Sequence, residues 1–311
     1  MKIVFLDAKT VGHNISLDPI KSEGDFEVYE ITSPDEVAKR IKGADIVITN
    51  KVIINLGKKE LGDTSNLKLI CVAATGYNNI NLDEAKKKNI PVANVTGYST
   101  DSVAQTVFSY ILTFTNSPLK FDKDVKNSEW SKSHIFTLLN YSITELKGKK
   151  LGIIGYGNIG QKVAKIGKAF GMKILIAKRS RNDLENVLKN SDIITIHTPL
   201  SPETENMISK KEFKIMKKEA ILINTARGGI VNERDLYNVL KNKEIRGAAV
   251  DVMIEEPPRS NSPLFKLNNI IITPHVAWAS KEARQRVING VVKNIRKFKE
   301  GKIDEINLWS K

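Results

Sequence analysis

The sequence has few residues of several kinds, and each shortage excludes a class of protein. Cys71 is the only cysteine among 311 residues, so neither a disulfide within the chain nor a thiolate zinc site can form, and we expect no metal. No apolar run reaches the roughly eighteen residues of a membrane-spanning helix, and the apolar stretch after Met1 is too short for a secretory signal. We therefore expect a cytoplasmic protein with no membrane partner.

Aromatic residues are also scarce, at 6%, whereas the net charge of +14 is high. A basic chain can bind nucleic acid when clustered Lys and Arg neutralise phosphates. Here the lysines are scattered among acids, as at 217–219, and the aromatics do not alternate with basic runs as base stacking requires. We interpret the charge as a Lys-rich solvated surface that attracts small anions, and we expect no nucleic-acid partner. A salt-dependent DNA shift assay separates the two interpretations.

What the sequence does contain is a regular alternation of short apolar runs and helical stretches. A length of 311 residues fits two domains. A capping box at 33–36 predicts a helix to residue 42, and a second helix is expected at 82–89. Alternation of this kind predicts an α/β fold with parallel sheets. The expected strands are residues 2–7, 26–31, 44–50, 67–74 and 90–95, then 151–155, 173–177, 192–197, 220–225, 248–252 and 270–273.

Two longer helices are expected outside this alternation. Residues 101–115 are apolar on most sides, which predicts a helix buried in a core or at a subunit interface. Residues 282–299 form a basic amphipathic stretch that ends at Gly301 and is expected to return to the first domain. We therefore predict two doubly wound parallel-sheet domains, with residues 99–282 inserted between residues 1–98 and 283–311.

A glycine motif of the form G-x-G-x-x-G lies within residues 151–160, directly after an expected strand and before a helix. Gly155 permits a tight turn, Gly157 lets the backbone approach a pyrophosphate, and Gly160 allows close packing of helix and strand. The helix beginning near Asn158 offers free N–H groups to that pyrophosphate. The motif predicts dinucleotide binding, and the alternative is a glycine-rich turn without a nucleotide.

The end of the next expected strand bears on which dinucleotide is bound. An acid at this place holds the ribose hydroxyls of NAD, but the sequence has Lys178, Arg179, Ser180 and Arg181. Lysine and arginine attract a 2′-phosphate and serine can hydrogen-bond to it, so we predict NADP in preference to NAD. The alternative is that these side chains point into solvent.

Three polar residues follow expected strands of the second series. Arg227, Glu256 and His275 come after the strands at 220–225, 248–252 and 270–273, and open α/β sheets bind ligands at these strand ends. Each residue, considered alone, also has a structural interpretation. Arg227 could form a surface ion pair, Glu256 could be solvated, and His275 could simply lie in a turn.

Four motifs in order resemble the D-isomer-specific 2-hydroxyacid dehydrogenase family, over essentially the whole chain: 155–160, 224–229, 247–257 and 273–278. Residues 94–105 look most like the glycerate dehydrogenase (hydroxypyruvate reductase) branch. The resemblance implies a Rossmann NAD(P)-binding domain inserted into a flavodoxin-like substrate domain. It also implies hydride transfer between NAD(P)H and a small 2-keto acid such as hydroxypyruvate or glyoxylate, giving a D-2-hydroxy acid.

The resemblance assigns catalytic roles. His275 would protonate the carbonyl oxygen as the hydride arrives, and Glu256 would orient the imidazole and favour its charged form. Arg227 would bind the substrate carboxylate and carbonyl oxygen. The backbone amides of Thr75 and Gly76 would also hold the carboxylate.

Further residues would contact the cofactor in a cleft between the domains, whose closure excludes water. A homodimer built through the cofactor domain is implied as well. The contacts expected besides the glycines and residues 178–180 are Tyr156, Asn158 and Ile159 at the pyrophosphate, Thr198, Pro199 and Thr204 near adenosine, and Thr106, Thr225, Ala226, Asp251, His275 and Ala277 toward the nicotinamide.

Two rival functions keep the same fold. One is a cofactor-sensing interaction protein, since fold does not fix function, and it would be favoured if the three catalytic residues were incomplete. The other is a family member that acts on formate or phosphite. The sequence also departs from the family pattern at Lys178, where an acid is common, and at Asn78 and Asn81, where the loop often has Asp.

Overall fold

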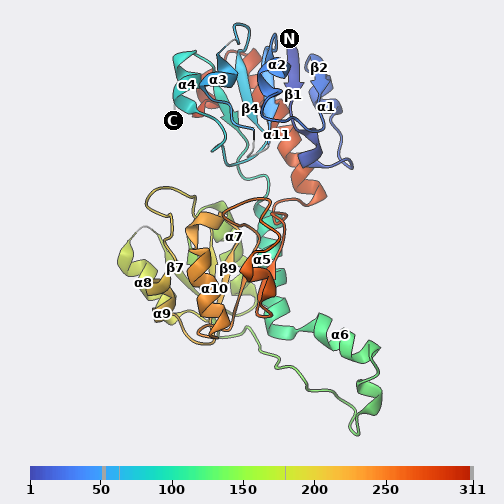
Figure 1. Cartoon of the computed structure of the whole chain (residues 1–311), viewed down its shortest axis with the longest axis vertical. Helices are drawn as coiled ribbons and strands as arrows, with labels where there is room; N and C mark the ends of the chain where they lie inside the picture. The colour runs from blue at the N-terminus through green and yellow to red at the C-terminus, as the bar shows by residue number, and fades with distance from the viewer. Residues whose placement is uncertain (51–53, 63, 179, 309–311) are drawn as a thin grey trace. The chain divides into compact units, whose positions relative to one another are not determined.

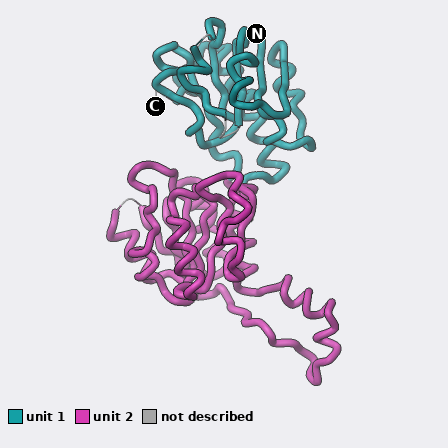
Figure 2. The backbone as a smooth tube through the Cα atoms, in the orientation of Figure 1, with its two compact units in different colours: residues 1–99, 278–311 teal, residues 100–277 magenta. Residues whose placement is uncertain are grey.

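The computed structural model describes residues 1–50, 54–62, 64–178 and 180–308. The chain forms two compact units, one of residues 1–99 and 278–311 and one of residues 100–277 (Figure 2). The chain returns to unit 1 at Trp278, earlier than the expected position of 283. All of helix α11 (Lys281–Lys299) therefore belongs to unit 1.

Unit 1 is built on a five-stranded sheet of order β2-β1-β3-β4-β5, with every neighbouring pair parallel (Figure 1). Its described strands are β1 (Lys2–Phe5), β2 (Asp25–Val28), β3 (Ile46–Thr49), β4 (Leu69–Val72) and β5 (Val92–Asn94). Its helices are α1 (Asp18–Lys21), α2 (Val37–Ile41), α3 (Lys58–Leu61), α4 (Leu82–Lys87) and α11, with short 3-10 turns η1 (Ala8–Val11) and η5 (Ile303–Glu305).

Both faces of this sheet are covered, which explains why its central strands are apolar throughout. Ile3 and Phe5 pack in one cluster with Val287 and Val291 of α11. Val4, between them, points to the opposite face and packs in the cluster that includes α2 and α3. Alternate residues of a strand point to opposite faces, so a strand covered on both sides needs no polar positions.

The predicted helix after the capping box is shorter than expected. Ser33 makes only half of the capping-box contacts. Its backbone N donates to Glu36 Oε2 over 3.0 Å, but its Oγ donates to the same oxygen over 2.6 Å, and Glu36 N donates to Ser33 O instead of to the hydroxyl. Residues 34–36 nevertheless form a turn, and α2 begins only at Val37. The motif therefore stabilises a turn ahead of the helix.

Unit 2 contains a six-stranded sheet of order β11-β10-β9-β8-β6-β7, also parallel. The strand order reverses beside β6, since β7 follows on one side and β8 on the other, and ligands of doubly wound sheets bind at such a switch point. The described strands are β6 (Lys150–Ile154), β7 (Lys173–Ala177), β8 (Ile193–Ile196), β9 (Ile221–Asn224), β10 (Gly247–Val250) and β11 (Ile270–Ile272). The predicted α/β class with two parallel sheets is confirmed.

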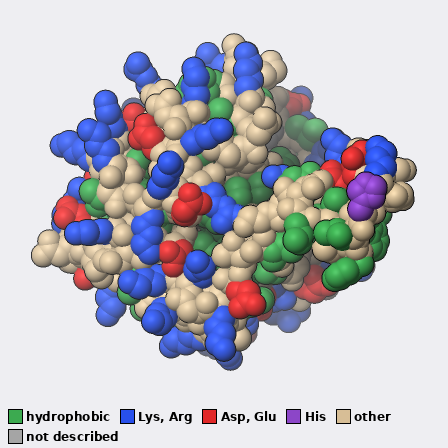
Figure 3. All heavy atoms as spheres, turned by 90° about the horizontal axis from the view of Figure 1, so that it is seen from below, with side chains coloured by type: hydrophobic (Ala, Val, Ile, Leu, Met, Phe, Trp, Pro, Cys, Tyr) green, Lys and Arg blue, Asp and Glu red, His purple; other side chains and the backbone are tan. Residues whose placement is uncertain are grey.

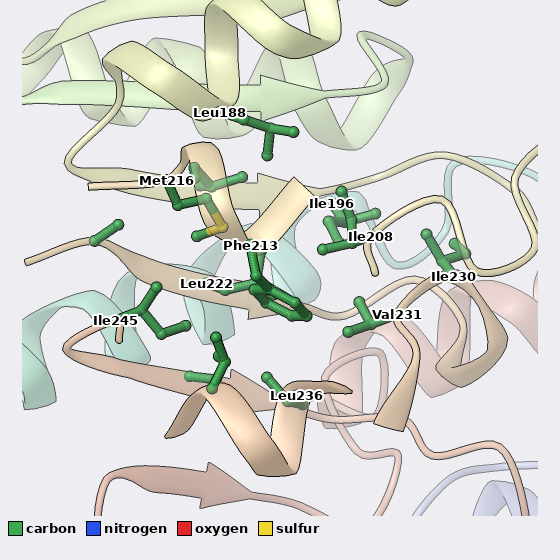
Figure 4. Packing of buried hydrophobic residues seen from close by; sticks show 14 of the residues in the cluster. Leu188, Ile196, Ile208, Phe213, Met216, Leu222, Ile230, Val231, Leu236 and Ile245 are labelled. Carbon is green, nitrogen blue, oxygen red and sulfur yellow. The ribbon is translucent and has the colours of Figure 1, made fainter. Parts of the chain in front are cut away.

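The helices of unit 2 cover its sheet. Figure 4 shows Leu188, Phe213 and Leu236 meeting Ile196 and Leu222 of the sheet in one hydrophobic cluster. The described helices are α5 (Thr100–Asn116), α6 (Pro118–Lys126), α7 (Asn158–Ala169), α8 (Arg181–Asn190), α9 (Lys210–Ile215) and α10 (Glu233–Lys241), with 3-10 turns η2 (Trp130–Lys132), η3 (Gly228–Ile230) and η4 (Pro263–Lys266). Among the described residues, no helix is both long enough and apolar enough to cross a membrane.

Residues 117–145, here called the arm, project from the body of unit 2 (Figures 1 and 2). The arm contains α6 and η2 and then returns as an extended strand-like segment. Within the arm, Tyr141 donates to Asp124 Oδ1 over 3.0 Å, and Thr144 N joins the arm to the end of α5 by donating to Thr115 O over 2.9 Å. The sequence analysis assigned no element to this segment.

Candidate active site

The turn between β6 and α7 is shaped by two glycines that the fold itself requires. Gly155 has a φ of +90°, and a Cβ there would lie 2.7 Å from the carbonyl carbon of His197. A Cβ on Gly160 would lie 2.3 Å from the carbonyl oxygen of Gly155. Any side chain at either position would therefore collide with backbone, which agrees with the roles predicted for both glycines.

Gly157 differs from these two glycines. It precedes α7 with an ordinary φ of −79°, and a Cβ there would meet no described atom within 4 Å. Protein packing thus leaves open space at the start of a 12-residue helix, where Tyr156, Asn158 and Ile159 also lie. Free N–H groups and the helix dipole favour an anion at such a place, so the turn fits a dinucleotide pyrophosphate.

The side chains of Ser180 and Arg181, which follow β7, form hydrogen bonds and ion pairs within the protein that the sequence did not indicate. Ser180 begins α8 and its Oγ accepts from Asp183 N over 3.0 Å. Arg181 pairs with Glu185 over 2.9 Å and with Glu212 over 2.8 Å. The expectation that Arg181 serves a cofactor phosphate therefore loses its basis, whereas Lys178 is exposed. The prediction for Arg179 lies outside the described residues.

His275 and Glu256 meet at the ends of neighbouring strands. His275 Nδ1 lies 2.6 Å from Glu256 Oε2, and Met253 N donates to Glu256 Oε1 over 2.9 Å. The two side chains are about one-third exposed, at 33% and 30%. Nδ1 is held by the carboxylate, whereas Nε2 has no hydrogen bond to a described residue.

Arg227 is close enough to act on the same carboxylate. Burial works to raise the pKa of Glu256, but the His275 hydrogen bond and charge, the Met253 amide and the Arg227 guanidinium together hold it below its usual range. The turn carrying Arg227 is fixed by Asn224, whose side chain donates to Arg227 O over 2.9 Å and accepts from Ala226 N over 3.0 Å.

Close backbone packing brings the turns after β9 and β10 together. A Cβ on Gly228, next to Arg227, would lie 2.1 Å from the backbone carbon of Met253. This contact requires glycine and sets Arg227 beside the turn that carries Glu256. Asn224 and Gly228, which hold these two turns in place, belong to the motif at 224–229, but the sequence gave them no role.

Asp251 organises the loop that follows β11. Its carboxylate accepts from Val276 N over 2.9 Å and from Ala277 N over 2.8 Å. Asp251 is 2% exposed, and this burial raises the pKa of its carboxyl although the donors oppose the shift. The structure thus brings together Asp251 and Ala277, two of the residues predicted on the nicotinamide side.

Thr225 gives an independent sign that a polar group belongs here. Its Oγ1 is buried, and it has no hydrogen-bond partner among the described residues. Buried hydroxyls are nearly always hydrogen-bonded, so this one is available to a bound molecule. Thr106, predicted on the same side, donates to Ser102 O over 3.1 Å. The open space at Gly157 and the unpaired hydroxyl of Thr225 both fit a bound dinucleotide.

The loop after β8 carries the residues expected near adenosine. Thr204 Oγ1 donates to Pro199 O over 2.7 Å and accepts from Ser201 N over 2.8 Å, which fixes the loop containing Thr198. His197 Nε2 lies 2.9 Å from Thr195 Oγ1, and burial lowers the pKa of His197 to about 3. His197 is therefore neutral at physiological pH, and its backbone forms a wall against Gly155.

Thr75 and Gly76 lie in unit 1, in the loop after β4. Thr75 Oγ1 donates to Val95 O over 3.1 Å, and Asn94 Nδ2 donates to Thr75 O over 2.7 Å. That these residues bind a substrate carboxylate stays a prediction. The described residues contain no group of three or more His, Cys, Asp or Glu side chains that could hold a metal ion.

Comparison with known proteins gives consistent matches over the full chain. The family model described as D-isomer specific 2-hydroxyacid dehydrogenase, NAD binding domain, matches residues 108–277. A glycerate dehydrogenase of Methylorubrum extorquens is 40% identical over 309 residues, with 97% of each chain covered. A hydroxypyruvate reductase of Blautia hydrogenotrophica is 35% identical, with 97% of this chain and 98% of the relative covered.

Solved structures agree with these sequence matches. An acyclic imino acid reductase in complex with NADPH and D-Arg has a TM-score of 0.87 and 33% identity, with 99% of this chain and 100% of that chain covered.

Proposed function

This chain belongs to the family of D-isomer specific 2-hydroxyacid dehydrogenases, and from that premise we propose which of its residues act and on which acids. Members of the family are oxidoreductases that interconvert 2-keto acids and D-2-hydroxy acids with a nicotinamide cofactor. When bound, this cofactor supplies or accepts the hydride.

We propose that His275 is the general acid and base. In reduction, Nε2 of the charged imidazole gives its proton to the carbonyl oxygen while carbon C2 receives the hydride, which yields the hydroxyl group. Glu256 accepts the hydrogen bond of Nδ1, fixes the ring orientation and balances the imidazolium charge. The observation that carries this proposal is the 2.6 Å contact between His275 Nδ1 and Glu256 Oε2 at adjoining strand ends.

Arg227 is proposed to bind the substrate. A guanidinium matches a carboxylate with two parallel hydrogen bonds, and its charge polarises the neighbouring carbonyl bond. The Asn224 contacts hold the Arg227 turn in place before substrate arrives, which favours a fixed geometry for hydride transfer.

Hydroxypyruvate and glyoxylate are the proposed substrates. The likeness to a glycerate dehydrogenase and to a hydroxypyruvate reductase supports acids that carry only hydrogen or a small polar group on C2. We further propose NADPH as the preferred cofactor, with Lys178 binding the 2′-phosphate. Ser180 can assist, because its oxygen accepts from Asp183 N and its proton remains available.

A homodimer formed through unit 2 is proposed for the assembly. The arm exposes large apolar side chains, among them Phe136 at 91%, Leu139 at 74% and Ile135 at 62%. Hydrophobic side chains gather on the projecting part of the surface in Figure 3. Exposed apolar clusters of this kind mark interaction surfaces, and a second copy of this chain is the proposed occupant. We place the protein in the cytoplasm, which suits a chain whose one cysteine is buried as a free thiol.

Reduction of a panel of 2-keto acids tests the reaction and its specificity. Purified protein is mixed with hydroxypyruvate, glyoxylate, pyruvate and larger 2-keto acids, with NADH and NADPH in parallel, and cofactor absorbance is followed. We expect the highest kcat/KM with hydroxypyruvate or glyoxylate and a D-configured product from hydroxypyruvate. Cofactor binding without turnover of any acid would instead favour a cofactor-sensing protein.

A further inference from the structure

The backbone of His275 has an unusual conformation that needs support. Its φ is +54°, in the left-handed region that residues with a Cβ seldom occupy. Such a conformation persists only when surrounding contacts fix it. The contacts that hold His275 therefore decide where its imidazole lies.

Asp251 supplies these contacts on both sides of His275. Its carbonyl oxygen accepts from His275 N over 2.8 Å, while its carboxylate accepts from Val276 N and Ala277 N. Thr273 Oγ1, on the other side, donates to Asp251 Oδ1 over 2.5 Å. Asp251 is buried and thus holds four residues of the loop, at positions 273, 275, 276 and 277.

The hydrogen bonds continue from Thr273 to helix α5. The hydroxyl groups of Thr273 and Tyr110 are hydrogen-bonded to each other. Thr273 has one hydroxyl proton, and a carboxylate can only accept, so that proton belongs to the bond with Asp251. Tyr110 must therefore be the donor to Thr273. Burial raises the pKa of Tyr110 to about 12, so the phenol keeps this proton at physiological pH.

Helix α5 contacts the same loop at a second point. Ser102 Oγ donates to Ala277 O over 2.7 Å, so the Ala277 residue is held through both its N–H and its carbonyl group. Ser102, Thr106 and Tyr110 recur every four residues and therefore share one face of α5. Ser102 and Tyr110, at the two ends of this row of hydroxyl groups, contact the loop that carries His275.

We propose that Tyr110 is a positioning residue for His275, acting through Thr273 and Asp251 from the far end of this hydroxyl row. The inference rests on the proposed role of His275 as proton donor. Tyr110 touches neither substrate nor cofactor. Its phenol holds Thr273 in the rotamer that donates to Asp251, and Asp251 fixes the backbone on both sides of the imidazole.

Removing single hydroxyl groups tests this chain of contacts. Tyr110→Phe and Thr273→Val are expected to lower kcat about tenfold while the KM for the keto acid and for NADPH stays within about twofold, because proton transfer is sensitive to small displacements. Thr273→Ser keeps the hydroxyl and is expected to retain kcat. The Tyr110→Phe, Thr273→Val double variant should be no slower than the slower single variant, because both changes break one chain.

Two controls keep the inference separable from misfolding and from the proposed function. Tyr237→Phe removes a phenol from α10 in the same unit, where the ring packs on the hydrophobic cluster, and it should leave kcat unchanged. Wild-type kcat in Tyr110→Phe, with or without a lower melting temperature, would overturn the inference. If His275→Asn also kept full turnover, the proposed function itself would fail. If only Tyr110→Phe and Thr273→Val were fully active, the positioning role alone would be wrong.

Discussion

At the residue scale, the proposed preference for NADPH depends on few side chains after β7. Arg181 is already paired with Glu185 and Glu212, so Lys178 is the exposed cation expected to meet a 2′-phosphate. Lys178→Glu is expected to lower kcat/KM for NADPH at least tenfold, from the loss of one charged hydrogen bond of about 1.5 kcal/mol plus repulsion, and to spare NADH. The matched control Lys173→Glu, at the other end of β7, should change neither value.

Steady-state rates with both cofactors provide the measurement. An unchanged ratio of NADPH to NADH efficiency in Lys178→Glu would show that this lysine points into solvent, which is the alternative that the sequence left open.

The sequence was enough to propose the candidate active-site residues, but it did not give the contacts between them. Arg227, Glu256 and His275 were found by their places after apolar runs and by four ordered motifs. Position after a strand does not give side-chain orientation, however. The contact between Glu256 and His275, which are 19 residues apart, depends on the Met253 amide and on the left-handed backbone of His275. Thr273 lies in the motif at 273–278, but the sequence does not indicate that it contacts Tyr110, because a hydroxyl in an apolar helix resembles any tolerated core residue.

At the element scale, the turn between β6 and α7 contains two kinds of glycine. Gly155 and Gly160 are required for folding, whereas Gly157 has open space beside it that a ligand could fill. Gly155→Ala places a Cβ 2.7 Å from the His197 backbone at positive φ, so we expect a melting temperature several degrees lower. Gly157→Ala meets no described atom within 4 Å, so it should melt like the wild type but bind NADPH more weakly. Thermal melts and fluorescence titration measure the two effects. Equal destabilisation by both changes would contradict this distinction.

In both sheets, an aspartate just before a central strand makes the same two contacts. Asp45, before β3, accepts from Lys2 N over 2.8 Å and pairs with Lys68 over 2.7 Å. Asp192, before β8, accepts from Lys150 N over 2.7 Å and pairs with Lys217 over 2.7 Å. Each aspartate thus fastens the start of the neighbouring strand.

The contacts of Asp192 predict how the free energy of unfolding depends on pH. Burial works to raise the pKa of Asp192, but the Lys150 amide and the Lys217 ammonium hold it below its usual value. An aspartate with a lowered pKa in the folded state stabilises above its unfolded pKa, and the effect is lost as the pH falls through the folded value. Asp192→Asn should therefore cost about 1 kcal/mol at neutral pH and much less once the pH lies below the folded pKa of Asp192.

Chemical unfolding at the two pH values measures this difference, with Asp45→Asn as the equivalent change in unit 1. An equal loss of stability at both pH values would show that the charge of Asp192 has no part in it.

Element positions were easier to predict than element ends. Buried parallel strands are continuous apolar runs, which is why the strands of both sheets were found, whereas α2 begins only after the turn that its capping residues form. No element of the arm was predicted, although Pro118 at the first position of α6 is a signal for the beginning of a helix.

At the scale of the whole molecule, substitutions in the arm can test the proposed homodimer. Each large apolar side chain that leaves water contributes about 1.5–3 kcal/mol, so burial of Phe136, Leu139 and Ile135 would add considerably to a dimer. We expect light scattering to give twice the chain mass for the wild type. Phe136→Asp should weaken the dimer and give monomers on dilution. Ile31→Asp changes a side chain that is 54% exposed in unit 1 and should leave the mass unchanged. A wild-type monomer at all concentrations would contradict the proposal.

The central claim is that the His275 imidazole, held by Glu256 beside Arg227, donates the proton that accompanies hydride transfer to a 2-keto acid. Single-turnover oxidation of bound NADPH by glyoxylate, in the wild type and in His275→Asn, tests it most directly. We predict that the variant binds NADPH with an affinity within about twofold of the wild type but transfers hydride at least about a hundredfold more slowly. Hydride transfer at the wild-type rate in His275→Asn would contradict the claim.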